Sequence, residues 1–346
     1  MLTNVFMGVL VLALAVATLW KIQYKPEKNS FMSFDDTSFL RGFWCIIVVL
    51  VHVPAEYQNS IQDMIGSFAY IGVTFFFMTS SFGLKYSIEH KEGYMNCFWR
   101  RRLPPILIPA LLANAIQVLA YGLSGESITI LSFINIDAWV KVLLLYYVLF
   151  WLIYGILPRI IQKGYWQDIV MCILVIGCSL VDYYTDFKIT YGWITEPLGF
   201  AYGIIAACFA QEIKKWIGTN WVIKSILLML FSGLFGVLYI KNKQVLFWGD
   251  YVLKVLLGIT ITLFVLILLG KLTVGNKINR FLGSISYEIY LIHHAVFALL
   301  MAIDSQMMNS GLFVVSSVCI TIMVAFCLKE ICKPIIKKIS TALGQE

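Results

Sequence analysis

Charged residues are scarce in this sequence. Only 13% of the 346 residues are Asp, Glu, Lys or Arg, whereas an ordinary soluble domain has about 25%. The shortage extends along the whole chain, and 60% of the residues are hydrophobic, with a mean hydropathy of +0.84. This balance excludes a soluble enzyme with a single membrane anchor and predicts a chain that crosses a membrane many times.

Several catalytic signatures are also absent. The chain has no P-loop, no Gly-x-Ser-x-Gly elbow, no His-Glu-x-x-His pair and no internal repeat, which argues against the enzyme classes that depend on those motifs. Its eight cysteines form no Cys-x-x-Cys pair and lie mostly in apolar segments, so we expect no disulfides. With four histidines, two of them adjacent, we expect no metal site.

What the chain does have is eleven apolar segments near the 17–25 residues that cross a bilayer. The sequence therefore predicts an all-α polytopic membrane protein with about eleven transmembrane helices. The first segment lacks a basic start and a small-residue cleavage site, so we interpret it as a retained helix rather than a signal peptide. The segments cover about residues 3–20, 39–56, 65–84, 104–122, 138–157, 168–183, 193–211, 222–240, 251–270, 281–303 and 311–329.

The positive charges indicate an orientation. If the N-terminus lies outside and the segments alternate, 21 of the 26 Lys and Arg residues face the cytoplasm. Cytoplasmic loops of membrane proteins carry such an excess, so we expect the N-terminus outside and the C-terminus inside, as in a multi-pass protein of a bacterial-type cytoplasmic membrane. The net charge of +7 then reflects topology, and we expect no nucleic acid partner.

The second segment carries two ionisable residues, Arg41 and His52. They are eleven residues apart, so on a helix they project from one face and lie about 16 Å apart along the axis. A lone arginine can snorkel to the membrane surface and a lone buried histidine can be a packing residue. Two on one face favour a functional role, because ionisable residues inside membranes are expensive.

A second polar stripe lies in the tenth segment, where Ser286, Tyr290 and His293 fall on one helix face. From the cytoplasmic start of that segment, His293 lies about 18 Å into the membrane, a depth similar to that of His52. We interpret the two imidazoles as parts of one buried polar site, with an interhelical hydrogen-bond ladder as the alternative.

Arg100, Arg101 and Arg102 directly precede the Pro-rich start of the fourth segment. Positive charge at that place can serve membrane insertion alone. The alternative is a cytoplasmic cradle for a phosphorylated ligand, because guanidinium groups match phosphate geometry.

Four stretches of the chain, in order, carry a family pattern. "FDDTSFLRGFWCIIVVLVHVP" contains an Arg-x10-His pair, and "GVTFFFMTSSFGL" contains a Phe-Phe-x-x-Ser segment with Ser81 where a Gly is usual. "FLGSISYEIYLIHH" and "EICKP" follow near the end. Together they resemble the acyltransferase-3 family of membrane acyltransferases over roughly residues 35–335. The family often has Arg-x-x-Arg before its fourth span, whereas in this chain Pro105 stands three places after Arg102.

The resemblance implies a ten-helix core, so residues 1–30 are expected to form an extra N-terminal helix and linker, and residues 31–346 the acyltransferase domain. It also implies transfer of an acyl group, usually acetyl, from cytoplasmic acyl-coenzyme A (acyl-CoA) to a hydroxyl of a surface or exopolysaccharide glycan. The acceptor would be lipid-linked or polymeric, and separate glycan-assembly proteins could take part alongside membrane lipid.

The resemblance and the chemistry together assign roles. The donor phosphates need cations, and a sugar hydroxyl needs a base, because it is a poor nucleophile at neutral pH. His52 can act as that base or accept the acyl group itself. The alternative function is a glycan exporter or flippase, although no inverted repeat is visible. The expected residues are Arg41, Arg100, Arg101 and Arg102 for the donor; His52, His293, Tyr290 and Ser80 for catalysis; and Glu196 and Trp139 for the sugar.

Overall fold

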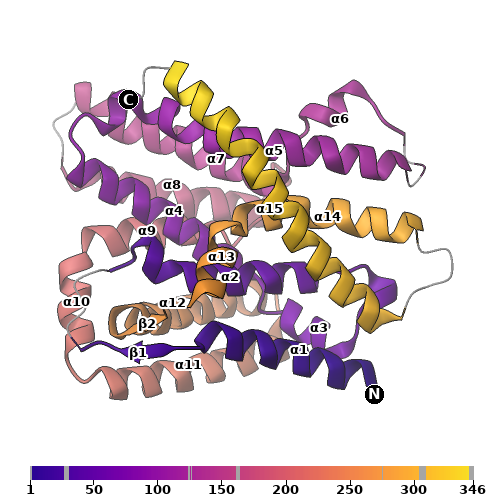
Figure 1. The fold of residues 1–346 in the computed structure, drawn as a ribbon. Helices are drawn as coiled ribbons and strands as arrows, with labels where there is room; N and C mark the ends of the chain where they lie inside the picture. Colours follow the sequence, from indigo (N-terminus) through magenta and orange to yellow (C-terminus); the bar gives the residue numbers. More distant parts are fainter. Residues whose placement is uncertain are drawn as a thin grey trace.

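The computed structural model describes residues 2–26, 31–123, 125, 127–160, 164–274, 276–303 and 309–342 (Figure 1). The long helices are α1 (Leu2–Leu19), α2 (Phe34–Val51), α4 (Tyr70–His90), α5 (Phe98–Leu123), α7 (Ala138–Trp151), α8 (Trp166–Tyr184), α11 (Trp221–Asn242), α12 (Lys254–Lys271), α14 (Ser286–Ile303) and α15 (Ser310–Ala342). The short helices are α3 (Ser60–Gly66), α6 (Ile130–Ile134), α9 (Leu198–Cys208), α10 (Ala210–Gly218) and α13 (Lys277–Ser284). π-Helical turns at Leu152–Ile156 and Trp248–Leu253 extend α7 and lead into α12.

Each of the eleven predicted segments contains a helix, and eight helical stretches among the described residues are long and apolar enough to cross a membrane. The other three segments differ in kind. α1 is an apolar helix of eighteen residues, and α9 is a shorter apolar helix. α2 carries three charges, Asp35, Asp36 and Arg41, in its eighteen residues. The chain is therefore an all-α polytopic membrane protein, as predicted, and its described residues contain eight candidate spans by length and composition.

Helix α2 is displaced from its predicted segment, 39–56. Ser33 caps its start, because the Ser33 side chain accepts from the Asp36 amide while Asp36 accepts from the Ser33 amide. At the other end, Pro54 disfavours helical backbone for the residue before it, and the helix stops at Val51. His52 is thus the C-cap residue of α2 rather than a mid-helix residue, and Arg41 lies about 10 Å along the helix from its start.

Close packing of α9 against α4 organises the centre of the molecule. A Cβ at Gly199 would lie 2.0 Å from the Thr74 carbonyl oxygen, and one at Gly203 would lie 2.0 Å from Ser81 Oγ. Only glycine permits that approach, and the four-residue spacing is the small-xxx-small pattern of membrane helix pairs. The contact holds the middle of α4, which carries Ser80, at a fixed depth in the bundle.

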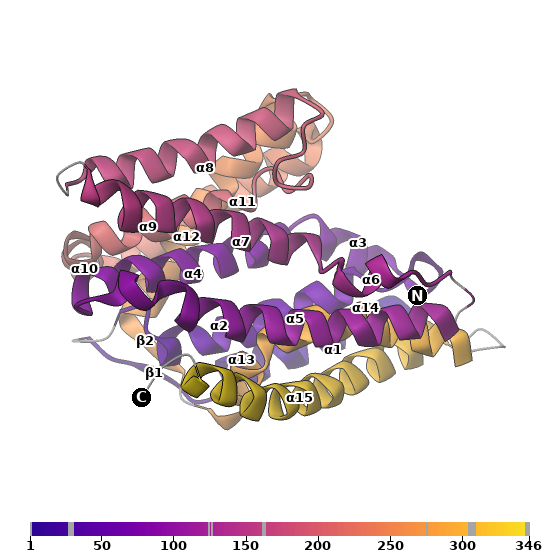
Figure 2. The ribbon, with the colours of Figure 1, turned by 90° about the horizontal axis from the view of Figure 1, so that it is seen from above.

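The helices lie roughly along one direction, with α15 on one side of the bundle, α8 on the other, and α2, α5 and α14 between them (Figure 2). α14 packs against α2, α5 and α15. α1 begins at the end of the bundle opposite to the end where α15 finishes (Figures 1 and 2).

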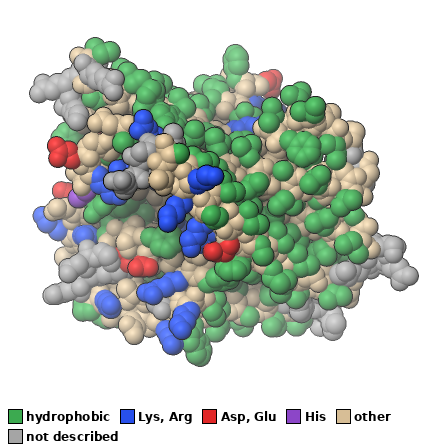
Figure 3. Space-filling view, turned by 45° about the horizontal axis from the view of Figure 1, so that its top comes forward, with side chains coloured by type: hydrophobic (Ala, Val, Ile, Leu, Met, Phe, Trp, Pro, Cys, Tyr) green, Lys and Arg blue, Asp and Glu red, His purple; other side chains and the backbone are tan. Residues whose placement is uncertain are grey.

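One end of the bundle, here called the basic end, holds β1, β2, α10 and the end of α15. The strands β1 (Ile22–Tyr24) and β2 (Leu272–Val274) pair antiparallel, with Gln23 opposite Thr273, a two-stranded sheet that the sequence did not predict. On the face shown in Figure 3, Lys and Arg gather mostly at this end while hydrophobic side chains cover most of the rest. Which side of a membrane this end faces stays a prediction.

The first helix is tied to the rest of the bundle at this end. Asn276 donates to the carbonyls of Ala17 and Trp20, and Asn279 donates to the carbonyl of Thr18. These carbonyls belong to the last turn of α1 or follow it, where a helix leaves backbone acceptors without internal partners. Helix α1 is therefore an integrated part of the fold.

Candidate active site

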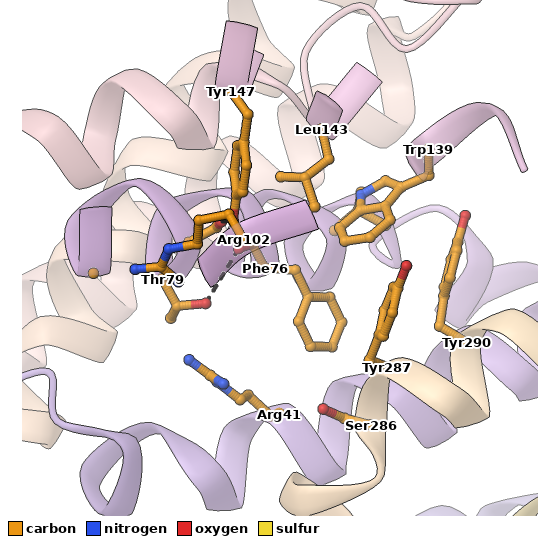
Figure 4. Close-up of a pocket in the computed structure, with 13 residues that line it drawn as sticks. Arg41, Phe76, Thr79, Arg102, Trp139, Leu143, Tyr147, Ser286, Tyr287 and Tyr290 are labelled. Carbon is orange, nitrogen blue, oxygen red and sulfur yellow. Dashed lines mark hydrogen bonds between the residues drawn. The ribbon is translucent and has the colours of Figure 1, made fainter. Parts of the chain in front are cut away.

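A cavity of about 300 Å³ lies between α2, α4, α5, α7 and α14. We call it the arginine cavity, because Arg41 and Arg102 both point into it (Figure 4). It extends from Arg102, near the start of α5 at the basic end, towards Trp139, near the start of α7. Five of the predicted site residues line it: Arg41, Ser80, Arg102, Trp139 and Tyr290.

The two arginines have little internal compensation for their charge. The Arg41 Nε atom is buried with no hydrogen-bond partner in the described part of the chain, and its guanidinium carbon lies 5.3 Å from the centre of the Phe34 ring. Arg102 donates from Nε to the Tyr94 hydroxyl at 2.5 Å. No carboxylate of the described residues forms an ion pair with either arginine. Two cations facing one cavity favour an anionic ligand, because a half-buried like-charge pair is costly.

Two hydroxyl groups from different helices form part of the wall of this cavity. Ser80 and Tyr147 share a hydrogen bond of 2.7 Å, so two hydroxyls from α4 and α7 meet at the wall. Tyr147 follows Tyr146 in an apolar run and was missed from the sequence, where two tyrosines in a span carried no signal beyond ordinary packing. Paired hydroxyls in an enclosed site can donate to a developing negative charge.

The far part of the arginine cavity is aromatic. The Tyr290 hydroxyl donates to Asp137 Oδ1 at 3.2 Å, and the Trp139 amide donates to the same oxygen at 2.8 Å. The rings of Trp139 and Tyr290 are 5.1 Å apart between centroids, and Trp139 Nε1 is buried with no partner in the described part. Trp139 therefore lies with Tyr290 and the arginines, away from Glu196, with which the sequence had grouped it.

The two histidines predicted to share one site lie side by side. The rings of His52 and His293 are 5.1 Å apart, and His294 lies 5.1 Å from His52. His293 donates from Nδ1 to the backbone carbonyl of Tyr290 at 2.6 Å, and the Tyr290 side chain lines the arginine cavity. His294 was not selected from the sequence, where an adjacent residue on a helix points about 100° away.

His52 also lines a second cavity of about 240 Å³, which we call the distal cavity, at the C-terminal end of α2 and near the starts of α4, α9 and α12. Glu196 and Lys254 form an ion pair of 2.8 Å in its wall. The Lys254 ammonium also lies 4.6 Å from the centre of the Tyr70 ring. Val73 lines both the distal cavity and the arginine cavity, so one side chain of α4 stands between the two spaces.

The three consecutive arginines do not form one cluster. Successive residues of a helix point about 100° apart, and only Arg102 reaches the arginine cavity. Arg101 is exposed, with its guanidinium carbon 6.0 Å from the Tyr94 ring. Arg100 is exposed beside a separate groove that Trp99 and Leu103 also line.

Comparison with known proteins agrees with the resemblance. A family model described as an acyltransferase domain, that of the acyltransferase-3 family, matches residues 35–330, which is most of the chain. No curated protein and no solved structure matches the chain. The matched region contains both cavities and all the residues that line them. The chain therefore belongs to the acyltransferase-3 family and is a membrane acyltransferase.

Proposed function

We propose that this acyltransferase moves an acyl group, most simply acetyl, from acyl-CoA to a hydroxyl of a surface or exopolysaccharide glycan. The observation that supports this most is the pair of cavities that share Val73. One begins near the basic end and carries cations without ion-pair partners among the described residues, and the other lies beside His52 at the C-terminal end of α2. A donor and an acceptor that approach from opposite ends would meet at this point.

The arginine cavity suits the donor. Acyl-CoA is a phosphorylated molecule with a long, thin pantetheine arm, and guanidinium groups bind phosphate through charge-assisted hydrogen bonds. A volume of about 300 Å³ is at the small end of the range for ligand pockets. We therefore place the acyl-pantetheine end inside, with Arg41 and Arg102 near its phosphate end. Arg100 and Arg101 lie outside this cavity at the basic end, where they would attract the anionic donor.

The distal cavity suits a sugar. Trp193, Tyr70 and Tyr239 contribute aromatic surface to it, on which the apolar face of a sugar ring can pack. The Glu196 carboxylate can accept hydrogen bonds from sugar hydroxyls, and the Lys254 ammonium can donate to them. Because these two charges already neutralise each other at 2.8 Å, the cavity favours an uncharged sugar unit, on a lipid-linked or polymeric glycan.

His52 is placed to act as the base. Its Nδ1 donates to the Val48 carbonyl at 2.9 Å, which leaves Nε2 with a free lone pair. Nε2 would take the proton of the sugar hydroxyl as its oxygen attacks the thioester carbonyl. The carbon–sulfur bond then breaks, and the proton passes to the departing coenzyme A thiolate. Ser80 or Tyr147 would donate to the carbonyl oxygen while it carries negative charge, whereas the Tyr290 hydroxyl already donates to Asp137.

A covalent route uses the same nitrogen. Nε2 of His52 would attack the thioester carbonyl, expel the thiolate and hold the acyl group as an acyl-imidazole. The sugar oxygen would then attack that carbonyl, the carbon–nitrogen bond would break, and the hydroxyl proton would leave with the thiolate released earlier. In both routes His293 is a positioning residue, because its ring packs against His52.

The proposal predicts turnover by the purified chain alone. The protein in detergent is incubated with radiolabelled acetyl-CoA, with and without a glycan acceptor, in the presence of membrane lipid and without added metal or other proteins. Free coenzyme A and labelled glycan are expected. Intact acetyl-CoA together with glycan translocation in proteoliposomes would instead identify an exporter.

A further inference from the structure

Three of the four histidines of the chain converge at the far end of α2. His52, His293 and His294 each offer a ring nitrogen, and these three nitrogens all lie within 4.8 Å of one another. The rings of His293 and His294 are 4.1 Å apart between centroids although the residues are adjacent on α14. The sequence predicted that His52 and His293 share one site, and the fold adds His294 to that pair.

The hydrogen bonds of two of these rings fix where their lone pairs are. A backbone carbonyl only accepts, so the ring nitrogen that contacts it must carry the proton. His52 Nδ1 contacts the Val48 carbonyl at 2.9 Å, and His293 Nδ1 contacts the Tyr290 carbonyl at 2.6 Å. In each neutral ring Nε2 is then a pure acceptor.

Nε2 of His52 and Nε2 of His293 therefore cannot hydrogen-bond to each other, because neither carries a proton. His293 is 1% exposed, and its Nε2 is buried with no hydrogen-bond partner in the described part of the chain. The neighbouring His52 cannot supply the missing donor, because its own Nε2 also presents a lone pair. A buried polar atom without a partner is unusual in a native protein and points to a group that fills the gap.

We propose that His52, His293 and His294 bind one divalent transition-metal ion of the zinc class, through Nε2 of the first two rings and a ring nitrogen of the third. Neutral imidazole is the usual nitrogen ligand for such ions. Metal-bound histidines almost always donate their other ring N–H to a carboxylate or backbone carbonyl, as His52 and His293 do here. Phe297 packs against His293 and His294, at 5.7 and 6.1 Å between centroids.

Binding requires only small movements of the rings. In a tetrahedral zinc site the bonds to nitrogen are about 2.0–2.1 Å, which puts the nitrogens about 3.4 Å apart. The histidine nitrogens, within 4.8 Å of one another, reach that spacing by rotation of their side chains. A tetrahedral ion with three protein ligands keeps a fourth position for water.

The ion would act as an inhibitor. This consequence rests on the proposed function, whereas the site itself does not. Nε2 of His52 cannot hold a metal ion and accept a proton or an acyl group at the same time. Occupancy by the ion and acyl transfer are therefore mutually exclusive, and a chelator should raise the activity of protein that carries the ion.

The test uses full-length protein purified through a tag without histidine, stripped of metal with a chelator and titrated with Zn²⁺ and Co²⁺. We expect one ion per chain and the visible absorption of tetrahedral Co²⁺. Loss of a residue that only hydrogen-bonds to a metal ligand typically lowers metal affinity by about 10–100-fold. Because His294→Gln removes a ligand itself, we expect it to weaken metal binding by at least about tenfold. The matched control is His90→Gln, because His90 is exposed and stacks on Tyr86. The affinity of His90→Gln for the metal ion should equal that of the wild type.

Binding no tighter than to a triple His52→Gln, His293→Gln, His294→Gln protein would overturn the proposal and leave water as the group that fills the gap. Equal affinities of His294→Gln and wild type would overturn it as well. Should His294→Gln fail to fold in size-exclusion chromatography, the Co²⁺ spectrum of the wild type decides. Acyl transfer is measured separately on the stripped protein, so a lack of turnover and a lack of metal binding are distinguished.

Discussion

Arg41 and Arg102 come from different helices, α2 and α5, and point into one cavity. At the scale of the residue, this pair gives the site its preference for an anion. Ser80 and Tyr147 add hydroxyls to the same wall, and Val73 separates this space from the one beside His52. Each of these features leads to a separate expectation for a single side chain.

Replacing Arg102 with Gln should weaken acetyl-CoA binding, because a hydrogen bond to a charged group contributes about 1.5–3 kcal/mol, which corresponds to about 10–150-fold in Kd. Arg101→Gln removes an equal charge from the same helix outside the cavity and should have a much smaller effect. Titration calorimetry on the two purified variants measures both. Equal losses would mean that the arginines act only through general electrostatic attraction.

Val73→Ala should widen the passage between the two cavities. We expect the ratio of turnover with butyryl-CoA to turnover with acetyl-CoA to rise by about tenfold, because one or two methylene groups in an apolar site change specificity by about that much. Val140→Ala is the control, since Val140 is fully buried in α7 and lines neither cavity. An unchanged ratio in Val73→Ala would show that Val73 does not border the acyl path.

The sequence indicated many of these residues but not how they combine. Arg41, Ser80, Tyr290, His52 and His293 stood out because polar side chains inside an apolar segment are expensive. Tyr147 and Val73 gave no such signal, because tyrosine and valine are ordinary in membrane helices. The separation of Arg102 from Arg100, and of Trp139 from Glu196, depends on helix rotation and helix contacts that one sequence does not specify.

At the scale of the element, the pairs of helices decide where the site lies. The contact between α4 and α9 is so close that two glycines are required where the backbones meet. All eleven helical segments could be predicted from hydropathy, whereas this pairing could not, because a Gly-xxx-Gly pattern does not say which neighbour it faces. The end of α2 was also misplaced by five residues, since Pro54 ends the helix before the apolar run ends.

Gly203→Leu should destabilise the protein strongly. The added Cβ would lie 2.2 Å from the Met78 carbonyl oxygen, and overpacking of this kind typically costs about 1–3 kcal/mol. Gly177→Leu is the matched control, because a Cβ at Gly177 in α8 meets nothing within 4 Å. Thermal unfolding in detergent should show a lower Tm for Gly203→Leu only. Equal Tm values would mean that α9 can move away from α4 without loss.

At the scale of the whole molecule, the two ends of the bundle differ in charge and in the cavity they are near. Lys and Arg gather at the basic end on the face in Figure 3, and the arginine cavity begins near that end. The distal cavity lies beside His52, at the C-terminal end of α2. If the basic end faces the cytoplasm, as the distribution of positive charge predicts, the donor and the glycan reach the site from opposite sides of the membrane.

Single-cysteine labelling tests this orientation. Glu92 lies in the turn after α4 at the basic end, and Asp186 lies in the turn after α8 at the other end. Each is replaced by Cys, one at a time, in a variant that lacks the eight native cysteines. An impermeant maleimide should label Asp186→Cys in intact cells and Glu92→Cys only after permeabilisation. The reverse labelling pattern would show that the protein has the opposite orientation in the membrane, and it would reverse the proposed direction of acyl transfer.

The most direct test of the account is the behaviour of His52→Gln in a paired measurement of donor binding and glycan acylation. Gln keeps a polar side chain of similar size but neither accepts a proton nor carries an acyl group, and general-base help is worth at least about 10²-fold. We predict a Kd for acetyl-CoA within about twofold of the wild-type value, which is about 0.4 kcal/mol, together with loss of labelled glycan. Near-normal transfer of radiolabelled acetyl to the glycan by His52→Gln would contradict the account, because the catalytic group would then not be His52.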